Sequence, residues 1–185
     1  MISRKPSVVR GLLVGAAAGI AATLVMDQFQ KLSAAGQKQL EKQKKLADGE
    51  SNWQIAHEQA IEEQKQASAE GSTEIVARHI AEATGNQIPP EKKKQAGNAV
   101  HYTFGTVMGV VYGLTTEFLP DASSGAGTAF GTILFLGADE IAVPALRLSP
   151  PPTDTAPTDH LQHWAAHVVY GGTLELVRSL LRRLV

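Results

Sequence analysis

The sequence predicts an all-α integral membrane protein, in which a four-helix bundle crosses the bilayer and a helical arm lies outside it. Four apolar stretches have close to the length of about 20 residues that a membrane-spanning helix needs. They are rich in glycine, which weakens a soluble helix but lets helices approach closely in lipid. The polar residues gather in one segment, 28–95, so the mean hydropathy of −0.08 averages two unlike parts.

The first apolar stretch, Gly11 to Met26, holds no charged residue, and we expect residues 1–27 to contain the first transmembrane helix. Two other interpretations compete with this one. A helix of a soluble core would carry a recurring polar face, whereas this stretch offers only Thr23. A cleaved signal peptide would suit the basic residues that precede the stretch, but the helical pattern continues past its end.

Residues 28–95 form a second unit, which is crowded with Gln, Lys, Glu and Ala. Ser72 offers an N-cap hydroxyl for a helix that Gly85 can end, and Pro89 and Pro90 then break the chain. We expect a polar helical hairpin outside the bilayer. The alternative is an arm that binds a partner protein or lies on the membrane surface.

Residues 96–185 are expected to supply transmembrane helices two to four. Their apolar stretches are 96–119, 122–146 and 161–177. Pro144 should kink or end the second of these. Arginine and lysine near both chain ends place both termini in the cytoplasm by the positive-inside rule. Four spans agree with this orientation, which puts the arm and the loop 147–160 on the outer side.

An octapeptide occurs twice, as VVYGLTTE from Val110 and as VVYGGTLE from Val168, with six of eight positions identical. The other two stretches share a pattern of two glycines followed by an aspartate. Its members are Gly15, Gly19 and Asp27 in the first copy and Gly127, Gly131 and Asp139 in the second. We therefore predict a duplicated two-helix unit with a pseudo-twofold axis along the membrane normal. A rival alignment matches His101 and Gly105 with His167 and Gly171.

The ionisable residues of the spans are expected to form two layers and to include the groups that handle protons or ions. The outer layer holds Asp27, His101, Asp139, Glu140, His163 and His167, and the inner layer holds Glu117 and Glu175. Charges are costly in a membrane and usually face the bundle interior, which makes them functional candidates. Structural roles compete at the ends of the spans, where Asp27 could sit among headgroups and Glu175 could pair with Arg178.

Three histidines follow the last loop at helical spacing. His163 and His167 are four residues apart and share a helix face, and His160 lies about one turn earlier. Histidines in this pattern can bind a divalent metal, respond to protons near neutral pH, or make hydrogen bonds that pack helices. No His-Glu-x-x-His pattern is present, so metal-dependent hydrolysis is not expected.

The chain resembles the YagU-like family of small bacterial inner-membrane proteins, a domain of unknown function. The resemblance rests on GLLVGAAAGIAATLVMDQFQ, VHYTFGTVMGVVYG, FLGADEIAVPALRLS and HVVYGGTLELVR, which cover all four spans. It implies a multi-pass protein of the inner membrane with no assigned catalytic activity, and a link to acid tolerance. Much of 28–95 lies outside the resemblance, so a function carried over from the family leaves the arm out of account.

Several function classes are excluded or disfavoured by composition. The absence of cysteine removes disulfides, iron–sulfur clusters and thiol catalysis, and a net charge of −1 gives no reason to expect a nucleic-acid partner. We expect no cofactor and no enzymatic activity. The leading expectation is proton or ion handling linked to acid stress. The alternatives are an assembly subunit whose arm, 28–95, binds a protein partner, and a protein that binds or transports a divalent metal. The glycine-rich helix faces would also permit a homo-oligomer.

Overall fold

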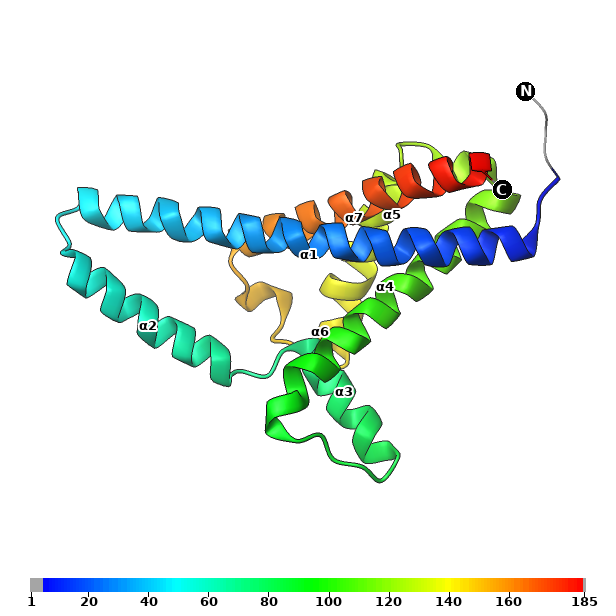
Figure 1. The fold of residues 1–185 in the computed structure, drawn as a ribbon. Helices are drawn as coiled ribbons and strands as arrows, with labels where there is room; N and C mark the ends of the chain where they lie inside the picture. The colour runs from blue at the N-terminus through cyan, green and yellow to red at the C-terminus, as the bar shows by residue number, and fades with distance from the viewer. Residues whose placement is uncertain (1–4, 185) are drawn as a thin grey trace.

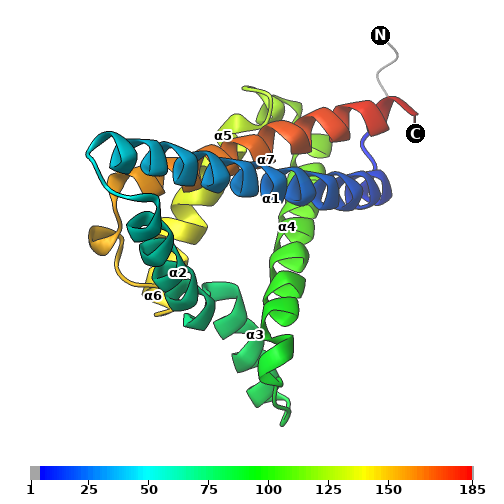
Figure 2. The same cartoon turned by 60° about the vertical axis from the view of Figure 1, so that its left-hand side comes forward.

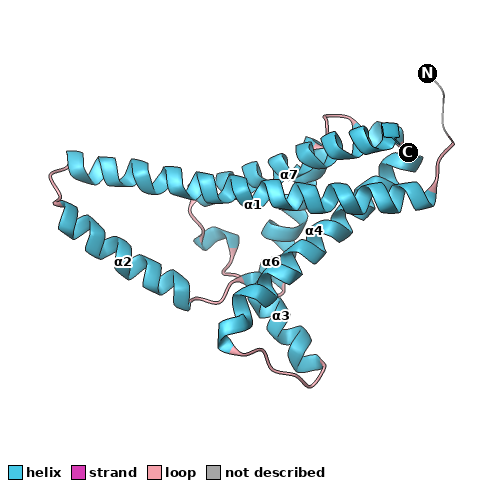
Figure 3. Cartoon of the chain, in the orientation of Figure 1, coloured by secondary structure: helices cyan, strands magenta, loops and turns pink. Residues whose placement is uncertain are grey.

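The computed structural model describes residues 5–184, apart from the side chains of residues 66 and 67. Within this range the chain forms helices and loops and no strand (Figure 3), so the predicted all-α class is confirmed. The helical elements are, in order, α1 (Val8–Ala47), α2 (Asn52–Ser68), α3 (Ser72–Ala83), η1 (Pro90–Lys92), α4 (Lys93–Phe118), η2 (Pro120–Ser123), α5 (Thr128–Leu134), η3 (Phe135–Ala142), α6 (Val143–Ala145), η4 (Pro152–Asp154) and α7 (Pro157–Leu184).

Each of the four predicted apolar stretches supplies a helix: α1, α4, the continuous helix α5–η3–α6, and α7. The third stretch was predicted from residue 122, but its helix begins at Thr128 after a turn. Helix α1 packs against both α4 and α7, and α5 packs against α7. Figures 1 and 2 show α4 crossing α1 obliquely while α7 runs beside α1. The start of α1 and the end of α7 lie at the same end of the molecule, because Arg10 and Arg182 bind the same carboxylate.

Among the described helices, two are long and apolar enough to cross a membrane. These are α1 and the continuous helix Thr128–Ala145. Helices α4 and α7 do not contain so apolar a stretch, because glycine, threonine, tyrosine and histidine alternate with their aliphatic residues. Two helices thus support the predicted membrane location, and the four-span bundle stays a prediction.

Glycines on both helices build the contact between α1 and α4. A Cβ atom on Gly15 would lie 2.5 Å from the carbonyl oxygen of Gly109. A Cβ atom on Gly109 would in turn lie 2.5 Å from the oxygen of Gly15 and from the Cα atom of Gly19. The two backbones therefore touch, which is the close approach that small residues permit.

Helices α5 and α7 meet in the same way. A Cβ atom on Gly171 would strike the carbonyl oxygen of Gly127, and one on Gly131 would strike the carbonyl oxygen of His167. Gly127 also precedes α5 with a φ angle of 80°, a left-handed conformation that favours glycine. The molecule thus contains two helix pairs that cross backbone to backbone.

The two helix crossings are related by a sequence offset that differs from the offsets of both predicted alignments. Gly109 contacts Gly15 and Gly19, and Gly171 contacts the matching residues Gly127 and Gly131. Gly171 follows Gly109 by 62 residues, whereas the octapeptides are 58 apart and the rival alignment uses 66. The two octapeptides are therefore displaced by one helical turn, although the glycine-aspartate pattern keeps its predicted match.

Small and polar side chains fill the interior. Ala18, Ala22 and Ala166 are fully buried, and Tyr170 is buried where its hydroxyl donates to the carbonyl oxygen of Gly105 at 2.6 Å. Tyr112 packs against Phe130 with 4.9 Å between ring centroids. The larger aliphatic side chains of the same helices mostly face outward.

The predicted arm does not begin at a break in the chain. Helix α1 is continuous through the predicted boundary at residue 27 and extends beyond the start of α7 (Figure 1). Helix α2 begins at a capping box formed by Ser51 and Gln54 and is tied to α1 by the Lys38–Glu63 and Lys45–Glu58 ion pairs. Helix α3 then turns back and packs on α4, so the arm is more than a hairpin standing apart.

A π-helix, η3, continues α5 and carries Asp139 and Glu140. Pro144 has no N–H group, so it cannot make the α-helical bond to the carbonyl oxygen of Glu140. This loss gives a physical reason for the wider helical turn before it. The helix ends at Ala145, as expected of a proline near its end, and π-helical turns occur often at functional sites.

Candidate functional site

Asp27 and His101 face each other within hydrogen-bonding distance where α1 passes the start of α4. Asp27 Oδ1 lies 3.0 Å from His101 Nε2, and Asp27 Oδ2 accepts a hydrogen bond of 2.7 Å from the Tyr102 hydroxyl. Both oxygens of Asp27 therefore have partners on α4. The side chains of Asp27 and His101 are 20% and 30% exposed, so solvent still reaches the pair.

Asp139 and two histidines form a second acid–histidine group between η3 and α7. Asp139 Oδ2 lies 3.7 Å from His167 Nδ1 and 4.0 Å from His163 Nδ1. His167 Nδ1 also lies 3.0 Å from the carbonyl oxygen of His163, and its ring packs against Phe135. His167 is nearly buried, whereas the His163 side chain is 56% exposed.

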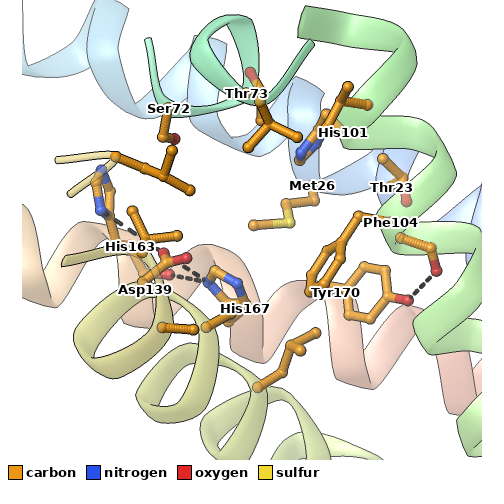
Figure 4. Close-up of a pocket in the computed structure, with 18 of the residues that line it drawn as sticks. Thr23, Met26, Ser72, Thr73, His101, Phe104, Asp139, His163, His167 and Tyr170 are labelled. Atoms are coloured by element: carbon orange, nitrogen blue, oxygen red, sulfur yellow. Dashed lines mark hydrogen bonds and ion pairs between the residues drawn. The ribbon is translucent and has the colours of Figure 1, made fainter. Parts of the chain in front are cut away.

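These two groups line one cavity of about 540 Å³. Figure 4 shows His101 on one side of it and Asp139, His163 and His167 on the other. Thr73 and Ser72 of α3 line the same cavity, as do apolar side chains that include Met26 and Phe104. The cavity therefore draws on both glycine-packed helix pairs and on the polar segment.

The two acid–histidine groups occupy matching places in the two helix pairs. Asp27 and Asp139 follow equivalent glycines, and His101 and His163 are 62 residues apart, the spacing that relates the two crossings. Each aspartate thus faces a histidine about two turns from its glycine crossing. The positions of these ionisable residues thus correspond between the two helix pairs, while the duplication itself stays a prediction.

Glu140 points to a different partner, His160, at the edge of the last loop. Glu140 Oε1 lies 2.7 Å from His160 Nδ1, and His160 Nε2 lies 2.9 Å from the carbonyl oxygen of Pro152. The carboxylate of Glu140, together with that carbonyl oxygen, raises the pKa of His160 above its ordinary value. This pair fastens the loop 147–160 to η3 and lies outside the set of cavity-lining residues.

Glu117 lies at the opposite end of the bundle and is held by two arginines. Arg10 and Arg182 donate to its two oxygens from α1 and α7, and the backbone N–H of Ser7 adds a bond of 3.1 Å. The Glu117 residue is only 3% exposed. This carboxylate therefore joins three helices by its charge.

Glu175 is held in a similar way. Arg178 donates to both of its oxygens at 2.7 Å, and the Tyr112 hydroxyl donates at 2.8 Å. The pairing of Glu175 with Arg178 that the three-residue spacing suggested is thus present. Both carboxylates of the predicted inner layer, Glu117 and Glu175, are thus bound by arginines. The outer layer has no arginine partner among these ion pairs of the described residues and is the better candidate for handling protons or ions.

The predicted metal ligands His160, His163 and His167 do not converge. His160 binds Glu140, while the other two face Asp139. Within the described part of the chain, no group of three or more histidine and acidic side chains is placed so that it could hold a metal ion.

Several contacts at these sites could not be read from the spacing of residues. The approach of Arg10 and Arg182 to Glu117 spans more than sixty residues of sequence in each case. The bond from the Tyr102 hydroxyl to Asp27 likewise joins residues 75 positions apart. The contact between Tyr112 and Glu175 did leave a trace in the sequence, because the two residues belong to the two copies of the octapeptide.

Comparison with known proteins gives one match. The model of a family described as a protein of unknown function, DUF1440, matches residues 81–176, which is just over half of the chain. Neither the curated proteins nor the solved structures contain a match. The predicted resemblance to YagU-like proteins therefore stays a prediction as to that name, although a family of unknown function is found.

Proposed function

The chain belongs to the DUF1440 family, whose function is unknown, and from its geometry we propose a multi-pass inner-membrane protein that handles protons or small ions without catalysing a reaction. One observation carries this proposal. Two matching acid–histidine groups, Asp27 with His101 and Asp139 with His163 and His167, line a single cavity. Carboxylates and histidines inside a membrane bundle are the groups that proton and ion pathways use.

The distribution of side chains supports four membrane spans. Large aliphatic and aromatic residues are exposed on every bundle helix, while glycine, alanine and hydroxyl groups are buried between them. The exposed set includes Leu13, Ile20, Leu24, Val107, Val111, Ile133, Leu136, Ile141, Leu176 and Leu180. A soluble protein rarely exposes large apolar patches, whereas lipid solvates apolar side chains that face outward. Only 39% and 11% of the two most apolar windows are buried, unlike the core helices of a soluble protein.

The charges support an orientation. Arg10, Arg178, Arg182 and Arg183 gather at the end of the bundle where α1 starts and α7 ends. By the positive-inside rule this end faces the cytoplasm, so both termini are cytoplasmic and the cavity opens toward the outer side. The histidines would then meet external acid first, in keeping with a role in acid tolerance.

The proposal is tested by proton flux in liposomes. Purified protein is reconstituted, a pH difference is imposed across the membrane, and the internal pH is followed with a fluorescent dye. We expect flux from the wild type and its loss in the double variant Asp27→Asn with Asp139→Asn. The matched control is Asp121→Asn, because Asp121 is an exposed aspartate in η2, far from the cavity lining. Equal flux from the wild type, the double variant and empty liposomes would end the proposal.

A second candidate function is an assembly subunit that binds a protein partner through the arm. The observation in its favour is the exposed apolar surface on α2 and on the adjoining half of α1, where Trp53 is 73% exposed and Leu32 is 74% exposed. Trp53 and Ile61 can be replaced together by glutamine without touching the cavity. Affinity purification from membranes should then lose a stoichiometric partner that the wild type retains. A partner kept by the variant, or none in the wild type, counts against this function.

A further inference from the structure

We propose that the cavity binds a monovalent organic cation with an apolar body, which competes with protons for the same site. The inference rests on the proposed function and names the ion that the outer site would take. It follows from three features of the lining: its charge, its apolar wall and its volume. All three features belong to the residues that line the cavity.

The charge of the lining favours a cation. Its titratable side chains are Asp27 on α1, His101 on α4, Asp139 on η3, and His163, His167 and Tyr170 on α7; the lining residues of α3 add none. The residues that line the cavity include no lysine or arginine. With the histidines neutral, the lining carries two negative charges, and a positively charged ligand would offset part of them.

The wall of the cavity favours an organic ligand over a bare metal ion. Met26, Phe104, Leu134, Val143 and Tyr170 give it a largely apolar surface with two aromatic rings. Aromatic faces attract ammonium groups, and apolar walls bury the hydrocarbon part of a ligand. A metal ion would use none of this surface, and no three ligands are gathered for one among the described residues. The volume of about 540 Å³ suits a small organic molecule.

Competition with protons follows from the pairing of acids with histidines. Each aspartate faces a histidine, so protonation of His101 or of His163 and His167 places a positive charge against the same carboxylate that the ligand needs. Protonation of all three would turn a lining charge of minus two into plus one. Acid on the outer side should therefore expel the cation, and a cation should hinder proton uptake.

Binding of benzyltrimethylammonium to the purified full-length protein in lipid nanodiscs tests the inference, measured by isothermal titration calorimetry. Benzenesulfonate serves as an anionic probe of similar size. We expect saturable binding of the ammonium at pH 7.5, no binding of the sulfonate, and an affinity that falls roughly tenfold or more at pH 5. Asp27→Asn and Asp139→Asn should each weaken binding by a similar factor, while Asp121→Asn leaves it unchanged.

Two further readouts keep the test decisive. Phe104→Leu keeps both carboxylates and an apolar side chain, so the variant should fold and bind the ammonium more weakly through the lost ring. No ammonium binding by the wild type, binding independent of pH, or equal binding of both probes would overturn the inference. Proton flux that persists in liposomes without ammonium binding would leave the proposed function standing and remove only the organic cation.

Discussion

Glu117 shows how single residues hold the end of the bundle opposite the cavity. Its side chain is 2% exposed and lies between Arg10 and Arg182, whose side chains are 13% and 35% exposed. Loss of this charge would take from both arginines the carboxylate that they share. Removing one member of a buried charge pair costs more free energy than the attraction within the pair contributes. The contact therefore matters to stability mainly through the cost of losing the Glu117 carboxylate.

Replacement of Glu117 by glutamine should destabilise the protein by about 3 kcal/mol, the lower end of the range for a broken buried pair, because Arg182 is partly solvated. The measurement is thermal unfolding in detergent followed by circular dichroism. Glu63→Gln is the control, since the Lys38–Glu63 pair is exposed on both sides and should cost under about 1 kcal/mol. Equal melting temperatures for the two variants would contradict this assignment.

His160 provides the pH-dependent contact at the other end. Its pKa is raised in the folded protein by the Glu140 carboxylate. A raised pKa means that the contact stabilises the fold below the ordinary histidine pKa of about 6.5. This contribution is lost as the pH rises through the folded-state pKa. The loop 147–160 should then be held more firmly in mildly acidic than in alkaline solution.

An NMR titration of the His160 ring checks this sign. We expect its midpoint above the ordinary histidine value in the wild type and a return toward that value in Glu140→Gln. His57 on α2 supplies the internal reference, since it stacks on Trp53 and its ring signal should be unaffected by the Glu140 substitution. An identical His160 midpoint in the wild type and in Glu140→Gln would contradict the pairing of His160 with Glu140.

At the scale of elements, the two glycine-packed crossings decide how the helices meet. Neighbouring glycines of α7 differ sharply in surroundings: a Cβ on Gly171 would strike the Gly127 backbone, whereas one on Gly172 meets nothing within 4 Å. The crossing therefore depends on one glycine and not on the other. Alanine at either position has the same helix propensity, so a comparison of the two isolates the packing.

Gly171→Ala should destabilise the protein by about 1–3 kcal/mol, because backbone atoms cannot rotate away from an added methyl group as side chains can. Gly172→Ala should instead stabilise it by up to about 1 kcal/mol through helix propensity. Both values come from unfolding of the two variants under the same detergent conditions. A Gly171→Ala variant as stable as Gly172→Ala would show that the α5–α7 crossing is looser than described.

At the scale of the whole molecule, the helices could be predicted from the sequence more fully than their contacts. Apolar stretches and small residues indicate helices, and the helices were found where those patterns lie. The correspondence between the two halves was predicted from identical letters, but the packing follows the glycines that touch, one turn away. Identical residues therefore did not locate the contact, which depends on the crossing point of two helices.

The candidate site divides in the same way. Asp27, His101, Asp139, His163 and His167 could be grouped from their position near one end of their spans, and they line one cavity. The choice of partners could not be predicted, since Glu140 turns to His160. The separation of two residues in the sequence does not tell which side chains come into contact in the fold. The contribution of α3 to the cavity lining could not be predicted either, because its polar composition indicated a helix outside the bundle.

The central claim is that the acid–histidine cavity and the arginine-rich end face opposite sides of a membrane. Cysteine labelling tests it most directly, because the chain has no cysteine of its own. Single cysteines at Ser68, Thr153 and Ser124 are treated with an impermeant maleimide in intact spheroplasts. We expect the first two to be labelled from outside and Ser124 to be labelled only after lysis. Labelling of all three from outside, or of Thr153 and Ser124 from one side alone, would contradict it.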